Sequence, residues 1–216
     1  MLENKTILSS ADIANLEQRY RAMLINSLSG FKSANLVATC DQSGINNLSI
    51  VSSVFHIGAN PPLVGMIVRP DTVKRDTLDN LKALNSYTIN HVNAAIYSKA
   101  HQTSARYRPD QCEFEEVGLT PQFADNIKAP FVRESLVKFA LEPREIAKLE
   151  INGTILVIGE VIQIIVPSDS IAADGYIDIE SLNTVTVSGL DSYHKTERLG
   201  RLSYAKPDRP LEHIDK

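Results

Sequence analysis

The sequence has few of the patterns that mark disulfide-rich, zinc-binding and nucleotide-loop proteins. Its two cysteines, Cys40 and Cys112, lie far apart without a CxxC pair, which argues against a disulfide framework and a zinc motif. Its ten glycines are never closer than six residues apart. The GxGxxG fingerprint, the GxxxxGK phosphate loop and the GxSxG nucleophile elbow are therefore all absent. The five histidines form neither an HExxH motif nor an i, i+4 pair, so we predict no metal site and interpret each as a core or surface residue.

Excess positive charge and long apolar runs are also missing. The formal net charge is −4, the isoelectric point is near 5.7, and the basic residues are dispersed apart from one cluster at 69–75. These values argue against a nucleic-acid partner, which calls for a basic face. No apolar run approaches the roughly 18 residues needed to span a bilayer, and the start MLENKTILSS lacks the features of a signal peptide. We expect a cytoplasmic protein with no membrane partner.

What is present is a strand-rich pattern of ordinary globular composition, with 43% hydrophobic and 22% charged residues. An amphipathic helix is predicted over 10–29, with an apolar face that should pack on a barrel or on a dimer partner. Shorter helices are predicted at about 77–85 and at 93–105, the latter capped by Asn93. Apolar runs bounded by turn residues predict strands at 32–40, 45–56, 63–68, 87–92, 131–141, 147–150, 154–166 and 184–187. Tight turns, above all Asn152-Gly153, join many of these strands. The predicted fold is mainly β, an antiparallel β-barrel with peripheral helices across its ends.

Residues 107–126 carry a weaker pattern, broken by proline and glycine. We interpret this stretch as a mobile or substrate-facing insert, or as a solvated loop. Its short acidic patch, Glu113, Glu115 and Glu116, has the residue types of a paired-carboxylate site. Nothing nearby in the sequence would set their protonation states apart, so we name no catalytic side chain.

The best candidate for ligand chemistry is the basic turn at 69–77. Basic residues and a hydroxyl, Arg69, Lys74, Arg75 and Thr77, come together at the predicted start of a helix. Free N–H groups and the partial positive charge of a helix start suit a phosphate, and Lys and Arg add full charges and donors. By spacing alone, an ordinary capped helix with solvated charges explains the turn equally well.

The order of several motifs resembles the flavin reductase-like family, whose fold is the FMN-binding split barrel of antiparallel Greek-key type. The motifs are NLSIVSS, NPPLVGMIV, KRDTLDNL and YTINHV, followed by FEEVGLTP, IKAPFVRESLVKFALE, GTILVIGEVIQI and the closing ERLGRLSY. The resemblance covers about residues 32–205. It implies an N-terminal helical segment at 1–30, a barrel domain at 31–205 and a polar tail at 206–216.

The resemblance also implies an NAD(P)H:flavin oxidoreductase, with FMN bound at the interface of a homodimer and NAD(P)H as co-substrate. Carried over by position, the residues facing the flavin ring, largely through backbone groups, are Asn47, Ser49, Ile50, Val51 and Ser52. Those holding the phosphate and ribityl chain are Arg69, Lys74, Arg75, Thr77 and Asn80, while Asp76 caps the helix and orders the turn.

The chain departs from the family pattern in two places. Ile50 and Val51 stand where the family often has a proline and an aromatic residue, which leaves less surface to stack on a ring. Gly200 is followed by Arg201 where a glycine pair is usual. Two alternatives stay open at this point: a flavin-binding electron carrier reduced by a protein partner, and a pyridoxal-phosphate-type binding module on the same barrel.

Overall fold

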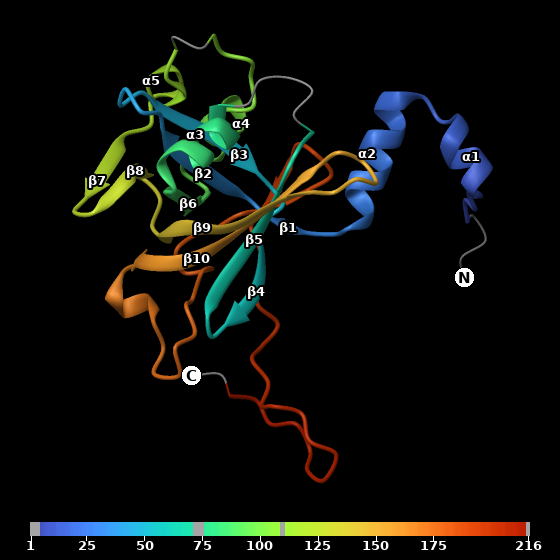
Figure 1. The fold of residues 1–216 in the computed structure, drawn as a ribbon. Helices are drawn as coiled ribbons and strands as arrows, with labels where there is room; N and C mark the ends of the chain where they lie inside the picture. The colour runs from blue at the N-terminus through green and yellow to red at the C-terminus, as the bar shows by residue number, and fades with distance from the viewer. Residues whose placement is uncertain (1–4, 71–75, 109–110, 215–216) are drawn as a thin grey trace.

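A seven-stranded antiparallel sheet forms the body of the chain in this computed structural model, which describes residues 5–70, 76–108 and 111–214 (Figure 1). Its strand order is β3-β2-β6-β9-β10-β5-β4. The bounds are β2 (Asn35–Cys40), β3 (Asn46–Val51), β4 (Phe55–Ala59), β5 (Pro62–Val68), β6 (Tyr87–His91), β9 (Lys138–Lys148) and β10 (Ile155–Ile165). A small sheet contains β1 (Lys32–Ser33), β11 (Thr186–Ser188) and β12 (Ser192–His194), and a separate hairpin contains β7 (Pro121–Ala124) and β8 (Ile127–Val132). The predicted mainly β, antiparallel architecture is confirmed.

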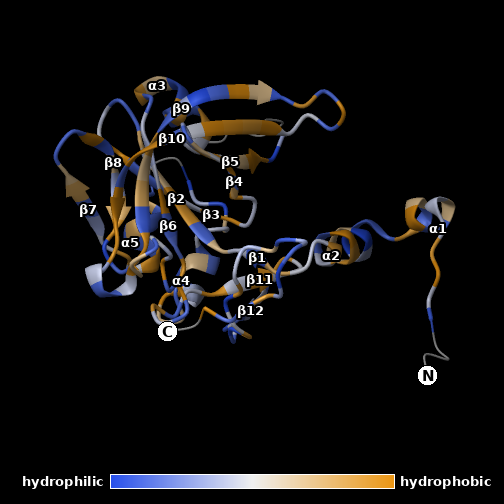
Figure 2. Ribbon diagram, turned by 90° about the horizontal axis from the view of Figure 1, so that it is seen from below, coloured by the Kyte–Doolittle hydropathy of each residue, from blue (hydrophilic) through white to orange (hydrophobic). Residues whose placement is uncertain are grey.

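The helices lie around this sheet and beyond it. They are α1 (Ser10–Asn15), α2 (Gln18–Leu28), α3 (Asp76–Leu84), α4 (Tyr97–Gln102) and α5 (Glu113–Val117), with a 3₁₀ turn, η1 (Ser168–Ser170). In Figures 1 and 2, α1 and α2 extend away from the sheet. Neither helix has a buried residue in the described chain, and Leu28 is 73% exposed.

The single helix predicted over 10–29 is wrong, because the chain forms two helices there. Leu16 and Glu17 adopt extended backbone conformations with ψ of 145° and 141°. The Glu17 carboxylate accepts a hydrogen bond from the Tyr20 N–H at 2.9 Å and so caps the second helix. Apolar residues recur at helical spacing throughout this stretch, so the sequence pattern did not indicate the break between the two helices.

Three other predicted elements are divided or shortened. The strand predicted over 45–56 becomes β3 and β4, and the one over 131–141 becomes the end of β8 and the start of β9. The second break is a turn that Lys138 holds, because its buried Nζ donates to the Val132 carbonyl at 2.9 Å. The helix predicted over 93–105 is only α4. Asn93 does not cap it; its Oδ1 accepts from the Ala95 N–H at 3.0 Å, within the preceding turn.

Two hydrophobic clusters share β2, whose six residues are all buried. Leu36 and Ala38 face the first cluster, which includes Phe114 of α5, whereas Val37 faces the second. The second cluster fills the curled sheet, and α3 contributes to it from one end; its buried members are Val37, Met66, Leu78, Leu81, Tyr87, Ile89, Leu141, Ile155 and Val157. Successive side chains of a strand point to opposite faces, so β2 separates and supports both cores.

The described part of the stretch at 107–126 is not simply a solvated loop. Of its described residues, 113–117 form α5 and 121–124 form β7. Phe114 is fully buried and Val117 nearly so, both in the first cluster. An amphipathic pattern only one helical turn long was too short to predict this helix.

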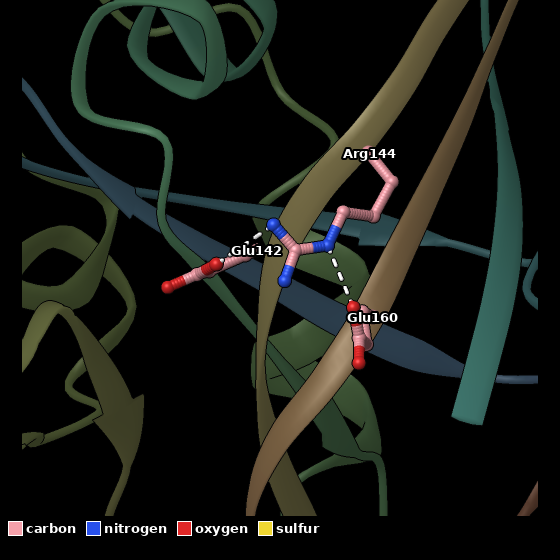
Figure 3. A network of polar contacts seen from close by, with 3 residues as sticks. All are labelled: Glu142, Arg144 and Glu160. Atoms are coloured by element: carbon pink, nitrogen blue, oxygen red, sulfur yellow. Dashed lines mark hydrogen bonds and ion pairs between the residues drawn. The ribbon is translucent and has the colours of Figure 1, made fainter. Parts of the chain in front are cut away.

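A bulge in β9 places one arginine between two glutamates on the sheet surface (Figure 3). Glu142 and Glu160 are direct cross-strand partners, and like charges in that position destabilise a sheet. The register shifts beside Pro143, and the Arg144 guanidinium then reaches Glu160 at 2.7 Å and Glu142 at 3.0 Å. All three side chains are part-exposed, so we assign this network to relief of repulsion, with little net stabilisation.

Tyr87 packs directly against a glycine inside the second cluster. A Cβ atom built on Gly159 would lie 2.1 Å from the Tyr87 hydroxyl oxygen and 2.9 Å from its ring. The same hydroxyl is buried and has no hydrogen-bond partner among the described residues. Burial raises the pKa of the Tyr87 hydroxyl. Gly159 is therefore required by close packing.

We expect Gly159→Ala to lower the free energy of unfolding by about 1–3 kcal/mol, the usual cost of overpacking. The measurement is urea denaturation, with Gly58→Ala as the control, since a Cβ there meets only one atom at an ordinary 3.5 Å. Tyr87→Phe alone should be neutral or stabilising, because it removes an unpaired buried hydroxyl. Equal stability of Gly159→Ala and the wild type would contradict this packing.

Candidate functional site

The candidate site begins on one face of β3. Alternation along the strand puts Asn47, Ser49 and Val51 on one face, with Leu48 and Ile50 on the other. Val51 packs against the second cluster and Ile50 against the first. The small polar side chains predicted for the ring thus share a face with Val51, whereas the Ile50 side chain points into the opposite core.

The start of α3 is joined to this polar face. The Thr77 hydroxyl donates to Asn47 Oδ1 at 2.7 Å. One helical turn later, the buried Asn80 side chain donates from Nδ2 to Thr39 Oγ1 on β2 at 3.1 Å. The first turn of α3 is therefore anchored beside β2 and β3, as a shared binding site requires.

Two side chains from the neighbouring layer cover the outer edge of β3. The Leu48 N–H donates to Glu113 Oε2 at 3.0 Å, and the Ile50 N–H donates to Thr103 Oγ1 at 3.0 Å. β3 is an edge strand, since it pairs only with β2 in its sheet, and unpaired edge groups need partners. These two N–H groups are consequently not free to bind a flavin edge.

The segment after β3 closes the curled sheet. Ser53 Oγ donates to the Ile67 carbonyl at 2.8 Å and accepts from the Ile67 N–H at 3.2 Å. Ile67 belongs to β5, which lies next to the far edge strand β4 in the strand order, and it comes two residues before Arg69. The Ser53 hydroxyl therefore holds the segment after β3 next to the start of the basic turn.

Among the predicted site residues, the structure joins Thr77 directly to Asn47, and the others differ in exposure. Arg69 is exposed, Ser52 and Asp76 are half-buried, and Asn80 is buried. Lys74 and Arg75 lie outside the described residues. The roles predicted for all of these residues toward a cofactor stay predictions.

Sequence reasoning missed Glu113 and Thr103 as neighbours of this site. Glu113 Oε1 and Oε2 accept from Asn47 Nδ2 at 3.1 and 3.2 Å, in addition to the Leu48 bond. Burial raises the pKa of the Glu113 carboxyl, and repulsion from Asp76 adds to this, while the bonds from Leu48 and Asn47 oppose it. The acidic patch was visible in the sequence, but only the fold places one of its members against β3.

His91, at the end of β6, is a second perturbed group. Burial lowers the pKa of its imidazole to about 4. Its ring lies edge-on to Phe139 at 6.4 Å between centroids, and its Nδ1 has no hydrogen-bond partner within the described part of the chain. This histidine is half-buried at the end of β6, and none of its contacts in the described residues marks it as a ligand-binding group.

Other features of the described residues lie away from the site. A mainly apolar cavity of about 510 Å³ is lined by Ile164, Ile165, Val166, Ile171, Gly175 and Ile177, none of them a predicted site residue. No group of three or more His, Cys, Asp or Glu side chains in the described ranges is arranged to hold a metal ion. None of the described helices combines the length and apolarity needed to cross a membrane.

Comparison with known proteins decides the family. Residues 28–180 match the model of the flavin reductase like domain. The chain belongs to the flavin reductase-like family. This confirms the resemblance seen in the motifs, and it supports the prediction of an oxidoreductase enzyme.

Solved structures agree with this membership. A candidate flavin reductase with a split barrel domain from Shewanella frigidimarina is 52% identical, covering 93% of this chain and 100% of its own, with a TM-score of 0.90. The NADH:FAD oxidoreductase of Streptomyces globisporus is 13% identical (TM-score 0.67; 90% of this chain and 99% of that chain covered). Flavoredoxin of Desulfovibrio vulgaris is 19% identical (TM-score 0.69; 83% and 92% covered). The last two show the fold alone, and together the three confirm the split barrel.

Among curated sequences, an uncharacterized Aquifex aeolicus protein is 30% identical over 105 residues. That match covers 48% of this chain and 54% of the relative, so the chain spans about half of that relative's length.

Replacing Ser53 should loosen the closure of the sheet. Ser53→Ala leaves the N–H and carbonyl of Ile67 without their Ser53 partner, and we expect a loss of about 1–3 kcal/mol in unfolding free energy. Ser52→Ala is the matched control. A denaturation midpoint for Ser53→Ala equal to that of the control would show that the hydrogen bonds between Ser53 and Ile67 do not stabilise the barrel.

His91 predicts a pH dependence of stability. Its pKa in the folded state, about 4, is below its ordinary value of 6.5, so the unfolded chain binds the proton more readily between these values. Stability is therefore lost as the pH falls from 6.5 toward 4. His91→Gln should flatten this loss by about 1–3 kcal/mol, whereas His56→Gln, at an exposed position, should leave it unchanged. Parallel pH profiles for the wild type and His91→Gln would refute the assignment.

Proposed function

We propose that the protein is an FMN-binding oxidoreductase, an NAD(P)H-dependent flavin reductase that passes hydride from nicotinamide to flavin and on to an acceptor. The family match over residues 28–180 carries this proposal. The hydrogen bond between Thr77 and Asn47 supports it, because it joins the basic turn to the polar strand face on which the family pattern depends.

The donors available at the site fit a phosphate. The first turn of a helix carries partial positive charge on its N–H groups, which suits the start of α3 to a phosphate, and the exposed Arg69 guanidinium would be a bidentate partner for it. Lys74 and Arg75 add two further cations in the sequence, although they lie outside the described residues. Thr77 and Asn80 would hold the cofactor end of α3 in place, and Asp76 would order the turn.

The polar face of β3 and the segment after it are proposed to hold the flavin ring. Asn47, Ser49, Val51 and Ser52 would line it, and Ile50 would contribute through its backbone. Because the Leu48 and Ile50 N–H groups already have partners, the directed bonds to the ring would come from other groups, such as the hydroxyls of Ser49 and Ser52.

A bound flavin supplies the hydride chemistry, and the protein supplies binding and orientation. We assign no side chain as general acid or base. The role of the chain's own residues is to fix the ring against β3, hold the phosphate at the turn and leave one ring face open for nicotinamide.

We further propose a cytoplasmic homodimer with FMN at its interface. The apolar residues of α1 and α2 support a partner, since Ile25 is 44% and Leu28 73% exposed along a face predicted to pack on something apolar. The division into an N-terminal segment at 1–30, a barrel at 31–205 and a tail at 206–216 remains part of this proposal.

The first test is the visible absorbance spectrum of the purified protein with FMN, before and after anaerobic addition of NADH or NADPH. We expect a protein-bound flavin spectrum that bleaches with at least one nicotinamide. A bound flavin that neither nicotinamide reduces would favour an electron carrier. A protein that takes up no flavin would overturn the proposal, and pyridoxal phosphate absorbance in its place would favour the other binding module.

A further inference from the structure

A chain of hydrogen bonds connects three segments that are distant in sequence. The Thr77 hydroxyl on α3 donates to Asn47 Oδ1 on β3 at 2.7 Å. The amide nitrogen of Asn47 donates to the carboxylate of Glu113 on α5 at 3.1 and 3.2 Å. The start of α3 is thereby linked to a helix 36 positions further along the chain.

The carboxylate sets the direction of this chain of bonds. An ionised Glu113 can only accept, so the Asn47 amide nitrogen must face it and the amide oxygen must face Thr77. Glu113 also accepts the Leu48 N–H at 3.0 Å, and this second bond fixes its carboxylate against the edge of β3. Asn47 therefore has one orientation, which offers an acceptor to Thr77.

We propose that Glu113 is a positioning residue for the phosphate subsite, acting through Asn47 on Thr77 and the first turn of α3. This inference rests on the proposed function, because it assigns a role at the flavin site. Glu113 touches neither phosphate nor ring; it holds the helix start that would bind the phosphate. Losing it should weaken recognition of the phosphate while leaving recognition of the ring intact.

The test compares FMN with riboflavin, which lacks the phosphate. Glu113→Asp keeps the negative charge but shortens the side chain by one methylene, so it cannot reach Asn47 and Leu48 together. We expect Glu113→Asp to weaken FMN binding about tenfold, the scale of one charge-assisted hydrogen bond, with less than a twofold change for riboflavin. Dissociation constants come from fluorescence titration of the full chain.

Glu116→Asp is the matched control on the same helix. The Glu116 carboxylate is exposed and accepts from Gln111 Nε2 at 3.0 Å, so this variant should bind both flavins as the wild type does. Thr77→Val provides the second test. If Glu113 acts through Thr77, Glu113→Asp should cause no further loss of FMN affinity in the Thr77→Val background.

The outcomes separate this inference from the proposed function. A wild type that binds neither flavin overturns both. A wild type that binds FMN, combined with an unchanged FMN affinity in Glu113→Asp, overturns the inference alone. Equal losses for FMN and riboflavin also overturn it, since they indicate general loosening of β3. Additive losses in the double variant would overturn the route through Thr77.

Discussion

The free edge of β3 is the constraint around which the structure is arranged. β3 lies at the edge of its sheet, yet Leu48 is fully buried and Ile50 is half-buried, and a buried N–H without a partner is costly. Glu113 and Thr103 satisfy these groups. The layer of α4 and α5 is consequently fixed to the strand by polar bonds as well as by the first hydrophobic cluster, and the opposite face of β3 remains for the candidate site.

Much of the fold could be predicted because it depends on local pattern. The β2–β3 hairpin follows from a turn in which Asp41 Oδ1 accepts the Ser43 N–H at 2.8 Å, a typical turn contact of aspartate. The long β10 was visible as a segment rich in Ile and Val, and the hairpin before it was marked by Asn152-Gly153. These features require no knowledge of distant neighbours.

The rest depends on contacts between distant residues. The break between β3 and β4 arises because Ser53 bonds to Ile67, and nothing near Ser53 in the sequence indicates that partner. Glu113 looked like a surface acid among three, and only tertiary packing separates it from Glu115 and Glu116. A family pattern names ligand-facing positions and says little of the residues that hold them in place, so Glu113 and Thr103 were not predicted.

β2 has no side chain facing solvent: all six of its residues are buried, and neighbouring residues serve different cores. Most strands at a protein surface tolerate substitutions on their solvent-facing side with little loss of stability. β2 offers no such face, and inserting or deleting one residue would exchange the side chains of its two cores. We therefore regard β2 as the segment in which related sequences have the least freedom to diverge, although it contributes none of the residues predicted to meet the ligand.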